Sequence, residues 1–250
     1  MIAVVNQKGG VGKTTTAVNL AAGLALAERR TLLVDLDPQG NATTGLGVQK
    51  SGLYPSVYHV LLGNEPIEKA IYSTSLTHLQ LLPSDIDLVG AEIELVALEA
   101  REYRFKTAIA TVLNRFDYVI VDCPPSLGLL TINALVAANR VLVPLQCEFY
   151  ALEGLTHLLK TVRLVRERLN PGLGVEGIVL TMFDGRTSLA LQIRDEVHRY
   201  FPGEIFESVI PRNVRLTEAP SHGKPVMAHD LRSSGATAYL ELTREVIKHE

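Results

Sequence analysis

A glycine-rich segment near the amino terminus, KGGVGKTT (8–15), constrains the fold of this chain most strongly. It follows an apolar, β-branched run, Ile2–Asn6, and it opens an alanine-rich stretch with helical periodicity. A second buried strand is expected at Thr31–Asp37. A strand, a glycine loop, a helix and a second strand within 37 residues form a unit that is almost always a right-handed parallel crossover.

The rest of the chain continues this alternation of strands and helices. Further strands are expected at Leu79–Ser84, within Tyr118–Ser126, and around 140–146, 175–183 and 207–213. Helices are expected at Ser56–Leu62, Pro66–Ile71, Asp85–Leu113 with a break near Tyr103, Leu127–Ala137, Glu153–Leu169, Ser188–Tyr200 and Ser233–Lys248. The pattern predicts a single α/β domain over residues 1–250, with a doubly wound, mostly parallel twisted sheet and helices on both faces. Ligands of such sheets bind at the carboxyl ends of the strands.

The glycine segment has the chemistry of a phosphate-binding loop. Backbone N–H groups of a loop at a helix amino terminus bind anionic phosphate, and the glycines let the backbone approach closely. Lys13 is expected to neutralise the β- and γ-phosphates of a nucleotide, and the Thr14 hydroxyl to hold Mg²⁺. The expected nucleotide-binding residues of the loop are Gly9, Gly10, Val11, Gly12, Lys13, Thr14 and Thr15. The alternative, a turn without a ligand, is disfavoured by the position between a buried strand and a helix.

Two aspartates are placed to complete this site. Asp37 follows the second predicted strand and Asp122 ends a later one, so both should lie at the sheet edge that carries the loop. Because Mg²⁺ keeps several waters in such sites, Asp122 is expected to orient one of them. Asp37 is expected to position or deprotonate the attacking water. Asp35 lies inside its predicted strand. It is either a buried acid whose hydrogen bonds are satisfied within the fold, or a residue that supports the nucleotide site.

The loop departs from the usual spacing G-x-x-x-x-G-K-[ST], because Gln7 stands where the first glycine belongs and an additional lysine, Lys8, precedes the glycines. Together with LLVDLDPQGN and YVIVDCPPSLG, it resembles the deviant Walker A ATPases, and within them the ParA/Soj partition proteins. The resemblance covers nearly the whole chain. It implies a slow, Mg²⁺-dependent ATPase that forms a sandwich homodimer on binding ATP. In that dimer the equivalent of Lys8 crosses to the phosphates of the other subunit.

The second half of the chain continues the resemblance. PLQCEFYALEGL (144–155) is similar to the family segment that faces the nucleotide across the dimer, which implies a ribose contact for Glu148. VIPRNVRLTEAPSHGKPV (209–226) resembles the carboxyl-terminal signature of the family, which implies that Pro211 and Asn213 border the adenine of ATP or ADP.

The resemblance also implies binding of double-stranded DNA without sequence preference, and a ParB-type centromere-binding partner that stimulates hydrolysis. Arg186 and Arg215 match positions that the Soj branch uses for DNA, and Lys224 and Arg232 are further candidates. Single surface arginines can equally be solvated or cap helices. Pairing two chains would double the contacts with DNA phosphates and place them under nucleotide control. The implied location is cytoplasmic, on the nucleoid.

Composition limits the classes of function. A net charge of −3 argues against a strongly basic nucleic-acid protein, and residues 151–250 hold 13 Lys/Arg and 13 Asp/Glu. DNA contact must therefore come from a local patch or from one assembled by pairing subunits. Two cysteines build no disulfide framework, which favours a reducing compartment. No basic leader with an apolar core, and no apolar run of about 20 residues, is apparent.

Three other classes of protein remain as alternatives. A division-site ATPase resembling MinD shares the loop but needs a basic amphipathic helix at its carboxyl end, whereas this chain ends YLELTREVIKHE with acids mixed in. An electron-transfer protein like the nitrogenase iron protein needs a different cysteine pattern from Cys123 and Cys147. A DNA-binding module without enzymatic activity leaves the two lysines and two aspartates unexplained.

Overall fold

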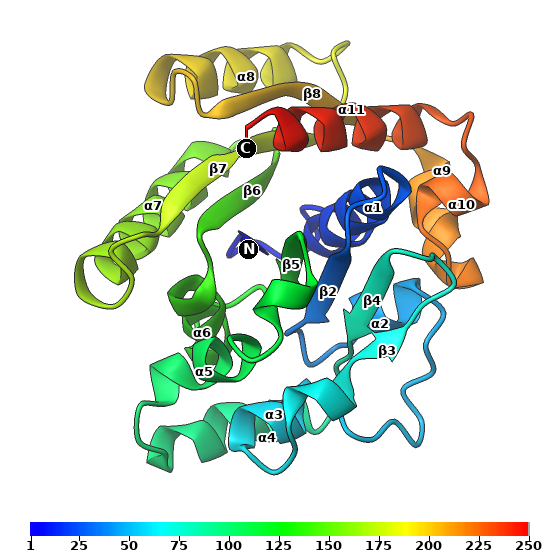
Figure 1. Cartoon of the computed structure of the whole chain (residues 1–250). Coiled ribbons are helices and arrows are strands. Elements are labelled where there is room, and N and C mark those ends of the chain that lie inside the picture. The colour runs from blue at the N-terminus through cyan, green and yellow to red at the C-terminus, as the bar shows by residue number, and fades with distance from the viewer. Residues whose placement is uncertain (250) are drawn as a thin grey trace.

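The computed structural model describes residues 1–249, which form an eight-stranded sheet of order β3-β4-β2-β5-β1-β6-β7-β8. Every neighbouring pair runs parallel except β3 and β4. The strands are β1 Ile2–Val4, β2 Thr31–Asp35, β3 Tyr72–Ser73, β4 Leu79–Leu82, β5 Tyr118–Asp122, β6 Arg140–Gln146, β7 Gly174–Phe183 and β8 Ile205–Pro211. The sheet passes through the middle of the molecule (Figure 1), so the predicted doubly wound α/β fold is confirmed.

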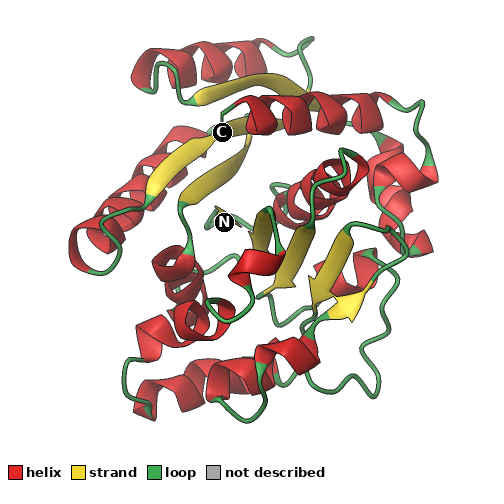
Figure 2. Ribbon diagram, in the orientation of Figure 1, coloured by secondary structure: helices red, strands yellow, loops and turns green. Residues whose placement is uncertain are grey.

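Helices cover both faces of this sheet (Figure 2). The α-helices are α1 Lys13–Leu26, α2 Asn41–Gly45, α3 Val57–Leu62, α4 Leu88–Glu94, α5 Arg104–Ile109, α6 Leu129–Ala137, α7 Ala151–Arg168, α8 Ser188–Tyr200, α9 Val214–Glu218, α10 Val226–His229 and α11 Ser234–Lys248. The 3₁₀ helices are η1 Ile67–Ala70, η2 Leu95–Ala97, η3 Arg101–Tyr103, η4 Leu113–Arg115 and η5 Ala219–His222. One core lies beneath α1, α10 and α11, and the other beneath α3 to α8.

The central strands β1, β2 and β5 are largely apolar because both of their faces are buried. In β1, Ile2 and Val4 pack into the core under α1, whereas Ala3 packs into the opposite core. This alternation follows from the two-residue period of a strand between two layers of helices. Helix α11 lies along α1 (Figure 1), and Gly23 of α1 permits the close approach, because a Cβ there would clash with Thr243 of α11.

The structure refines the predictions between residues 41 and 113. The helix predicted at Asp85–Leu113 with a break near Tyr103 consists of α4, η2, η3 and α5, and its break falls at residues 98–100, just before η3. Within Thr43–Ser75, which lacked a clear pattern, the chain forms α2 and the antiparallel edge strand β3. Short elements of this kind carry too few residues for a periodic signal, and tertiary packing decides their conformation.

The predicted site residues gather at the carboxyl edge of the sheet. The loops that leave β1, β2, β5, β7 and β8 all open at this edge, because these strands are parallel. The chain order reverses on either side of β1, whose neighbours are β5 and β6. Such a reversal is the usual position of a ligand crevice in a doubly wound sheet.

Candidate nucleotide site

The loop between β1 and α1 has the conformation of an anion-binding turn. Gly10 and Gly12 have backbone φ angles of 75° and 89°, which residues other than glycine rarely adopt. Gly12 caps α1, and Lys13 is the first residue of the helix. The Lys13 ammonium donates a hydrogen bond to the backbone carbonyl of Lys8 at 2.9 Å. The loop therefore wraps around the Lys13 side chain at the positive end of the α1 dipole.

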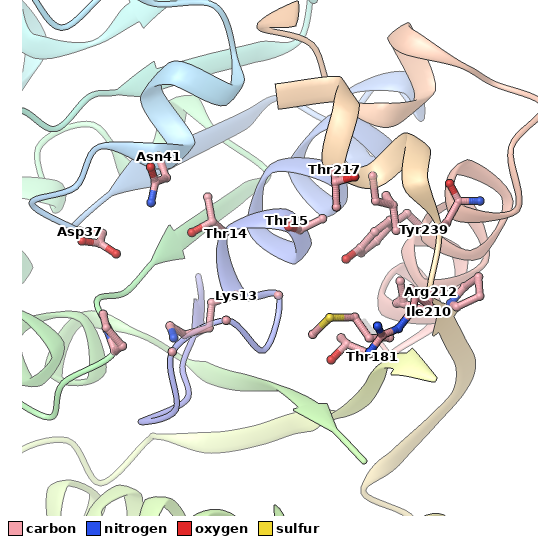
Figure 3. Close-up of a pocket in the computed structure, with 18 of the residues that line it drawn as sticks. Lys13, Thr14, Thr15, Asp37, Asn41, Thr181, Ile210, Arg212, Thr217 and Tyr239 are labelled. Carbon is pink, nitrogen blue, oxygen red and sulfur yellow. The ribbon is translucent and has the colours of Figure 1, made fainter. Parts of the chain in front are cut away.

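A cavity of about 530 Å³ opens above this loop. Figure 3 shows Lys13, Thr14 and Asp37 toward one end of it, and Thr181 and Arg212 toward the other. The predicted residues that line it are Gly9, Gly10, Gly12, Lys13, Thr14, Thr15, Asp37, Pro211 and Asn213. The cavity thus joins the phosphate loop to the segment expected beside the adenine, and its volume is that of a small-molecule site.

Asp122 lies at the floor of the site, directly beside Asp35 in the sheet register. It is fully buried, and neither of its carboxylate oxygens makes a hydrogen bond within residues 1–249. Burial raises the pKa of Asp122 well above its ordinary value, and the neighbouring Asp35 raises it further. The Thr14 hydroxyl lies close enough to lower the same pKa, as does the charge of Lys13, but the contact of that hydroxyl with Asp122 does not have the geometry of a normal hydrogen bond. A buried carboxyl without partners is costly, so this position calls for a cation or an ordered water.

The two aspartates at the end of β2 differ in their surroundings. Asp35 accepts hydrogen bonds from the Thr43 backbone N–H at 2.8 Å and from the Thr43 hydroxyl at 2.7 Å. Burial nevertheless raises its pKa to about 6. Asp37 accepts one hydrogen bond, from the Gln39 backbone N–H at 2.9 Å, and borders the cavity. Asp35 is therefore satisfied by the fold, whereas Asp37 keeps carboxylate capacity for a ligand.

Lys13 is the buried cation of the site, with 6% of its surface exposed. Burial lowers the pKa of its ammonium group, and Asp122 and Asp37 oppose that change. A desolvated ammonium between two carboxylates interacts strongly with a further anion, because little water screens it.

Lys8 lies outside the cavity and forms an ion pair with Glu148, on the loop between β6 and α7. Both side chains are about half exposed, at 49% and 43%. The side chains expected to act across a dimer are thus paired with each other within one chain. Phe149 and Tyr150, which follow Glu148, expose 77% and 69% of their surface, so an apolar surface adjoins this ion pair.

Several cavity residues were not predicted from the sequence. Thr181, at the end of β7, donates a hydrogen bond to the Val11 carbonyl at 2.8 Å and so buttresses the loop. Tyr239 of α11 reaches the cavity from the far end of the sequence, and its hydroxyl lies 3.1 Å from that of Thr16. Thr181 could have been found in the sequence as a polar residue near the end of the apolar run VEGIVLTMF. Tyr239 could not, because in the sequence it looks like an ordinary aromatic residue of the core.

The segment after β8 closes the other end of the cavity. Asn213 caps α9, since its Oδ1 accepts from the Arg215 backbone N–H at 2.8 Å, and its Nδ2 donates to Ser234 at 2.6 Å. Pro211 ends β8 and lines the cavity. The first residue of α11 therefore anchors Asn213, in the segment expected beside the base.

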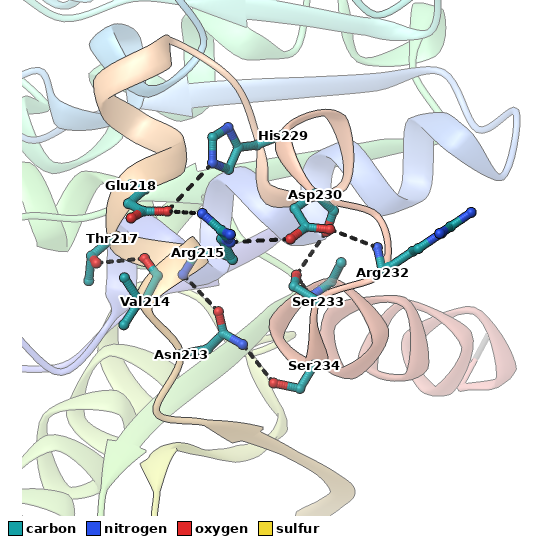
Figure 4. A network of polar contacts seen from close by, with 11 residues as sticks. Asn213, Val214, Arg215, Thr217, Glu218, His229, Asp230, Arg232, Ser233 and Ser234 are labelled. Atoms are coloured by element: carbon teal, nitrogen blue, oxygen red, sulfur yellow. Dashed lines mark hydrogen bonds and ion pairs between the residues drawn. The ribbon is translucent and has the colours of Figure 1, made fainter.

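The arginines expected to contact DNA are exposed and lie outside the cavity. Arg186 pairs with Asp184 through two hydrogen bonds of 2.8 and 2.7 Å. Arg215 lies between Glu218, at 2.7 Å, and Asp230, at 3.3 Å, whereas the Arg232 side chain extends away from this network (Figure 4). Lys224 is exposed beside a second cavity near α2. The structure thus places Arg215, Lys224 and Arg232 in one region and Arg186 at the end of β7.

The cysteines occupy unrelated positions. Cys123 is fully buried, and burial raises its pKa well above the ordinary value. Burial also raises the pKa of Cys147, to about 11. Both thiols are therefore protonated near neutral pH, which makes them poor nucleophiles. Within residues 1–249, no helix is both long and apolar enough to cross a membrane.

Known proteins of similar sequence show which family this chain belongs to. Residues 1–175 match the AAA domain family, so the chain is a P-loop ATPase. It is 54% identical to the chromosome partitioning protein ParA of Myxococcus xanthus over the whole chain and 88% of that protein. It is 55% identical to the sporulation initiation inhibitor protein Soj of Bacillus subtilis, covering 98% of this chain and 97% of that protein. The chain therefore belongs to the ParA/Soj family of chromosome-partitioning ATPases, as the resemblance predicted.

A solved structure of a relative shares the fold. It is described as cobyrinic acid a,c-diamide synthase from Mycobacterium smegmatis with bound ADP and magnesium. The two chains are 41% identical, with a TM-score of 0.87, and the match covers 99% of this chain and 94% of that one. That fold therefore accommodates ADP and Mg²⁺.

Proposed function

We propose that this protein binds Mg²⁺-ATP in the cavity above its phosphate loop and hydrolyses it to ADP and phosphate to drive chromosome or plasmid partition. The observation that carries the proposal is the Asp122 carboxylate, buried and without a hydrogen-bond partner within residues 1–249, beside Lys13 and Thr14. A bound cation would relieve this unfavourable burial. Membership of the partition family supports the biological role.

The residues at this position suit Mg²⁺. The Thr14 hydroxyl would be a direct ligand, and Asp122 and Asp37 would hold it through water. When bound, Mg²⁺ neutralises charge on the β- and γ-phosphates of the nucleotide. Pro211 and Asn213 would border the adenine, and the backbone N–H groups of Gly9 to Thr15 would hold the phosphates.

The chemical step assigns separate roles to the charged side chains. Asp37 accepts a proton from the attacking water, whose oxygen forms a bond to the γ-phosphorus as the bond to the β-phosphate oxygen breaks. Lys13 stabilises the charge on the phosphoryl group from within the same chain. The products are ADP and inorganic phosphate.

A second lysine comes from a partner copy of this chain. In the proposed ATP-bound sandwich dimer, Lys8 reaches the phosphates of the partner subunit, and Glu148 reaches its ribose. Because Lys8 and Glu148 pair with each other within one chain, that ion pair must open before the dimer closes. The pair is half exposed, so opening it costs at most about 1 kcal/mol.

The dimer would bind double-stranded DNA without sequence preference through Arg186, Arg215, Lys224 and Arg232, and so associate with the nucleoid in the cytoplasm. A ParB-type centromere-binding protein would accelerate hydrolysis and release the DNA. Because the chain carries a net charge of −3, the DNA contacts would come from this local patch, and pairing two chains would double the number of its contacts with phosphate.

Replacement of Asp37 tests this function. Asp37→Ala should lower the rate of ATP hydrolysis about 100-fold or more, because it removes the proton acceptor. It should also retain the ATP-bound dimer on DNA, measured by co-sedimentation with random-sequence DNA. Asp195→Ala, which removes an exposed carboxylate of α8, is the matched control and should hydrolyse ATP normally. Hydrolysis by Asp37→Ala at the parent rate would refute the assignment.

A further inference from the structure

The turn that follows β2, residues 37–40, brings the carboxylate of Asp37 to the nucleotide cavity. Figure 3 shows Asp37, which begins the turn, and Asn41, which follows it, at the same end of that cavity. The Gln39 backbone N–H donates a hydrogen bond to the Asp37 carboxylate at 2.9 Å, and the Gly40 N–H donates to the Asp37 carbonyl at 2.8 Å. Gly40 has a φ of 59°, and a glycine can leave this conformation at little cost. The turn therefore depends on contacts from the rest of the chain.

Two side chains from outside the turn supply such contacts. Ser84, which is fully buried, donates a hydrogen bond from its hydroxyl to the Asp37 carbonyl at 2.8 Å. The Lys50 ammonium donates a hydrogen bond to the Gln39 carbonyl at 2.6 Å. Both backbone polar groups of Gln39 are thus engaged, its N–H by the Asp37 carboxylate and its carbonyl by Lys50. Ser84 fixes the start of the turn, and Lys50 fixes the residue whose N–H orients the carboxylate.

The backbone and the stem of Lys50 are placed for this contact. The stem lies across Gly40, so closely that a Cβ at Gly40 would come within 2.7 Å of the Lys50 Cδ. The segment before Lys50 is anchored at Gly47, because a Cβ there would lie only 3.0 Å from the carbonyl oxygen of Gly223. Lys50 itself is exposed, so water competes for its ammonium and the hydrogen bond contributes modestly.

We propose that Lys50 is a positioning residue for the hydrolysis step. Its ammonium holds the Gln39 carbonyl, and the N–H of the same residue holds the Asp37 carboxylate toward the attacking water. Without Lys50 the turn moves more freely at Gly40, and Asp37 is correctly placed for less of the time. Lys50 does not border the nucleotide cavity, so it acts through Asp37 and not on the nucleotide. This role rests on the proposed function of Asp37.

Hydrolysis rates of three variants test this role. Lys50→Met keeps an apolar stem over Gly40 but removes the ammonium, and it should lower kcat about fivefold to tenfold, the effect of one hydrogen bond from a charged donor. Its affinity for an uncleavable ATP analogue and its nucleotide-dependent dimerisation should equal those of the parent protein. Lys50→Arg restores a charged donor and should retain at least about half of the parent rate. Lys69→Met, which removes an exposed ammonium paired with Glu65, is the matched control and should hydrolyse ATP normally.

Three results would overturn the proposal at this stage. The first is hydrolysis by Lys50→Met at the parent rate. The second is an equal loss of rate in Lys50→Met and Lys50→Arg, which would show that hydrogen-bond donation is not the cause. The third is loss of dimerisation or of analogue binding by Lys50→Met, which would place Lys50 in assembly or in nucleotide binding.

A double variant shows whether Lys50 acts through Asp37. If it does, removing Lys50 should have no effect once Asp37 is gone. Asp37→Ala combined with Lys50→Met should therefore hydrolyse ATP, in a single turnover, at the rate of Asp37→Ala alone. A further loss of about fivefold in the double variant would mean that Lys50 contributes independently, and the positioning role would fail.

Hydrogen exchange follows the turn without relying on hydrolysis. In the ADP-bound protein, the amides of residues 39–41 should exchange faster in Lys50→Met than in the parent protein or in Lys69→Met, because the turn opens more often. Unchanged exchange in Lys50→Met overturns the proposal. If exchange rises but the parent protein hydrolyses no ATP, Lys50 supports the turn, whereas its role in hydrolysis and the proposed function both fail. If Asp37→Ala is slow while Lys50→Met behaves as the parent protein, the proposed function stands and only this inference fails.

Discussion

At the scale of single residues, two of the arginines expected to contact DNA are already engaged by carboxylates. The Arg186 guanidinium donates two hydrogen bonds to the Asp184 carboxylate, and these lower the pKa of Asp184 to about 2. The carboxylate therefore stays ionised at neutral pH. Arg215 is held in a similar way by Glu218 and Asp230. In the proposed complex, DNA phosphates would compete with these acids, which would lower the affinity for DNA.

Removal of the acid beside Arg186 should strengthen DNA binding. Asp184→Asn should lower the dissociation constant for random-sequence duplex about threefold, because an exposed ion pair contributes less than about 1 kcal/mol. Fluorescence anisotropy with an uncleavable ATP analogue measures the change. Asp195→Asn removes the same charge from the pair with Arg194 on α8. Equal gains in the two variants would indicate an effect of net charge and contradict a contact by Arg186.

The residue scale also shows what the sequence alone could provide. Lys13, Thr14 and Asp37 were predicted because loop chemistry is local, and all three line the cavity. Tyr239 was missed because more than 200 residues separate it from the phosphate loop, and only the packing of α11 on α1 brings it there. The ion pair of Lys8 with Glu148 was missed for the same reason.

At the scale of elements, hydrogen bonds between Arg30 and Asp117 connect the start of β2 with the start of β5. Asp117 accepts hydrogen bonds from the Arg30 backbone N–H at 2.8 Å and from its guanidinium at 3.2 and 2.6 Å. The hydrogen bonds from Arg30 lower the pKa of Asp117 to about 2. Because the folded-state pKa lies below the ordinary value of about 3.9, the stabilisation is present above pH 4. It is lost as the pH falls through 2.

Asp117→Asn measures this contribution. At pH 6 it should lower the free energy of unfolding by roughly 1 kcal/mol or less, the range for a pair near the surface. The difference from the parent protein should shrink below about pH 4, since the unfolded parent then takes up a proton on Asp117 while the folded parent stays ionised down to about pH 2. Urea unfolding at pH 6, 4 and 3 follows the effect. A difference that stays constant across this range would show that the charge of Asp117 is not its source.

Long elements were predicted well and short ones poorly. Helices α7, α8 and α11 and the buried strands have enough residues for a clear period, and they lie within a few residues of their predicted bounds. Asp85–Leu113 was predicted as a helix with a break near Tyr103, and the structure divides this segment at residues 98–100 into short helices. Ile86, Val89, Ile93 and Val96 recur every three or four residues in its first part, but they are exposed and do not pack into the core.

At the scale of the whole molecule, the nucleotide site lies open at one edge of the sheet, beside the exposed segment of Glu148, Phe149 and Tyr150. Fold class and family follow from the order of motifs along the chain. The residues through which the surface binds other molecules do not follow from that order, because they depend on which charged side chains pair with each other in the folded chain. The proposed dimer supplies what one chain lacks, a second ammonium at the phosphates.

The central claim is that ATP joins two copies of this chain through Lys8. Sedimentation velocity of the parent protein and of Lys8→Ala, each with Mg²⁺ and an uncleavable ATP analogue, with ADP, or without nucleotide, tests it most directly. The parent protein should be dimeric only with the analogue, and Lys8→Ala should bind the analogue yet remain monomeric throughout. A parent protein that stays monomeric at saturating analogue, or a Lys8→Ala variant that dimerises equally well, would contradict the account.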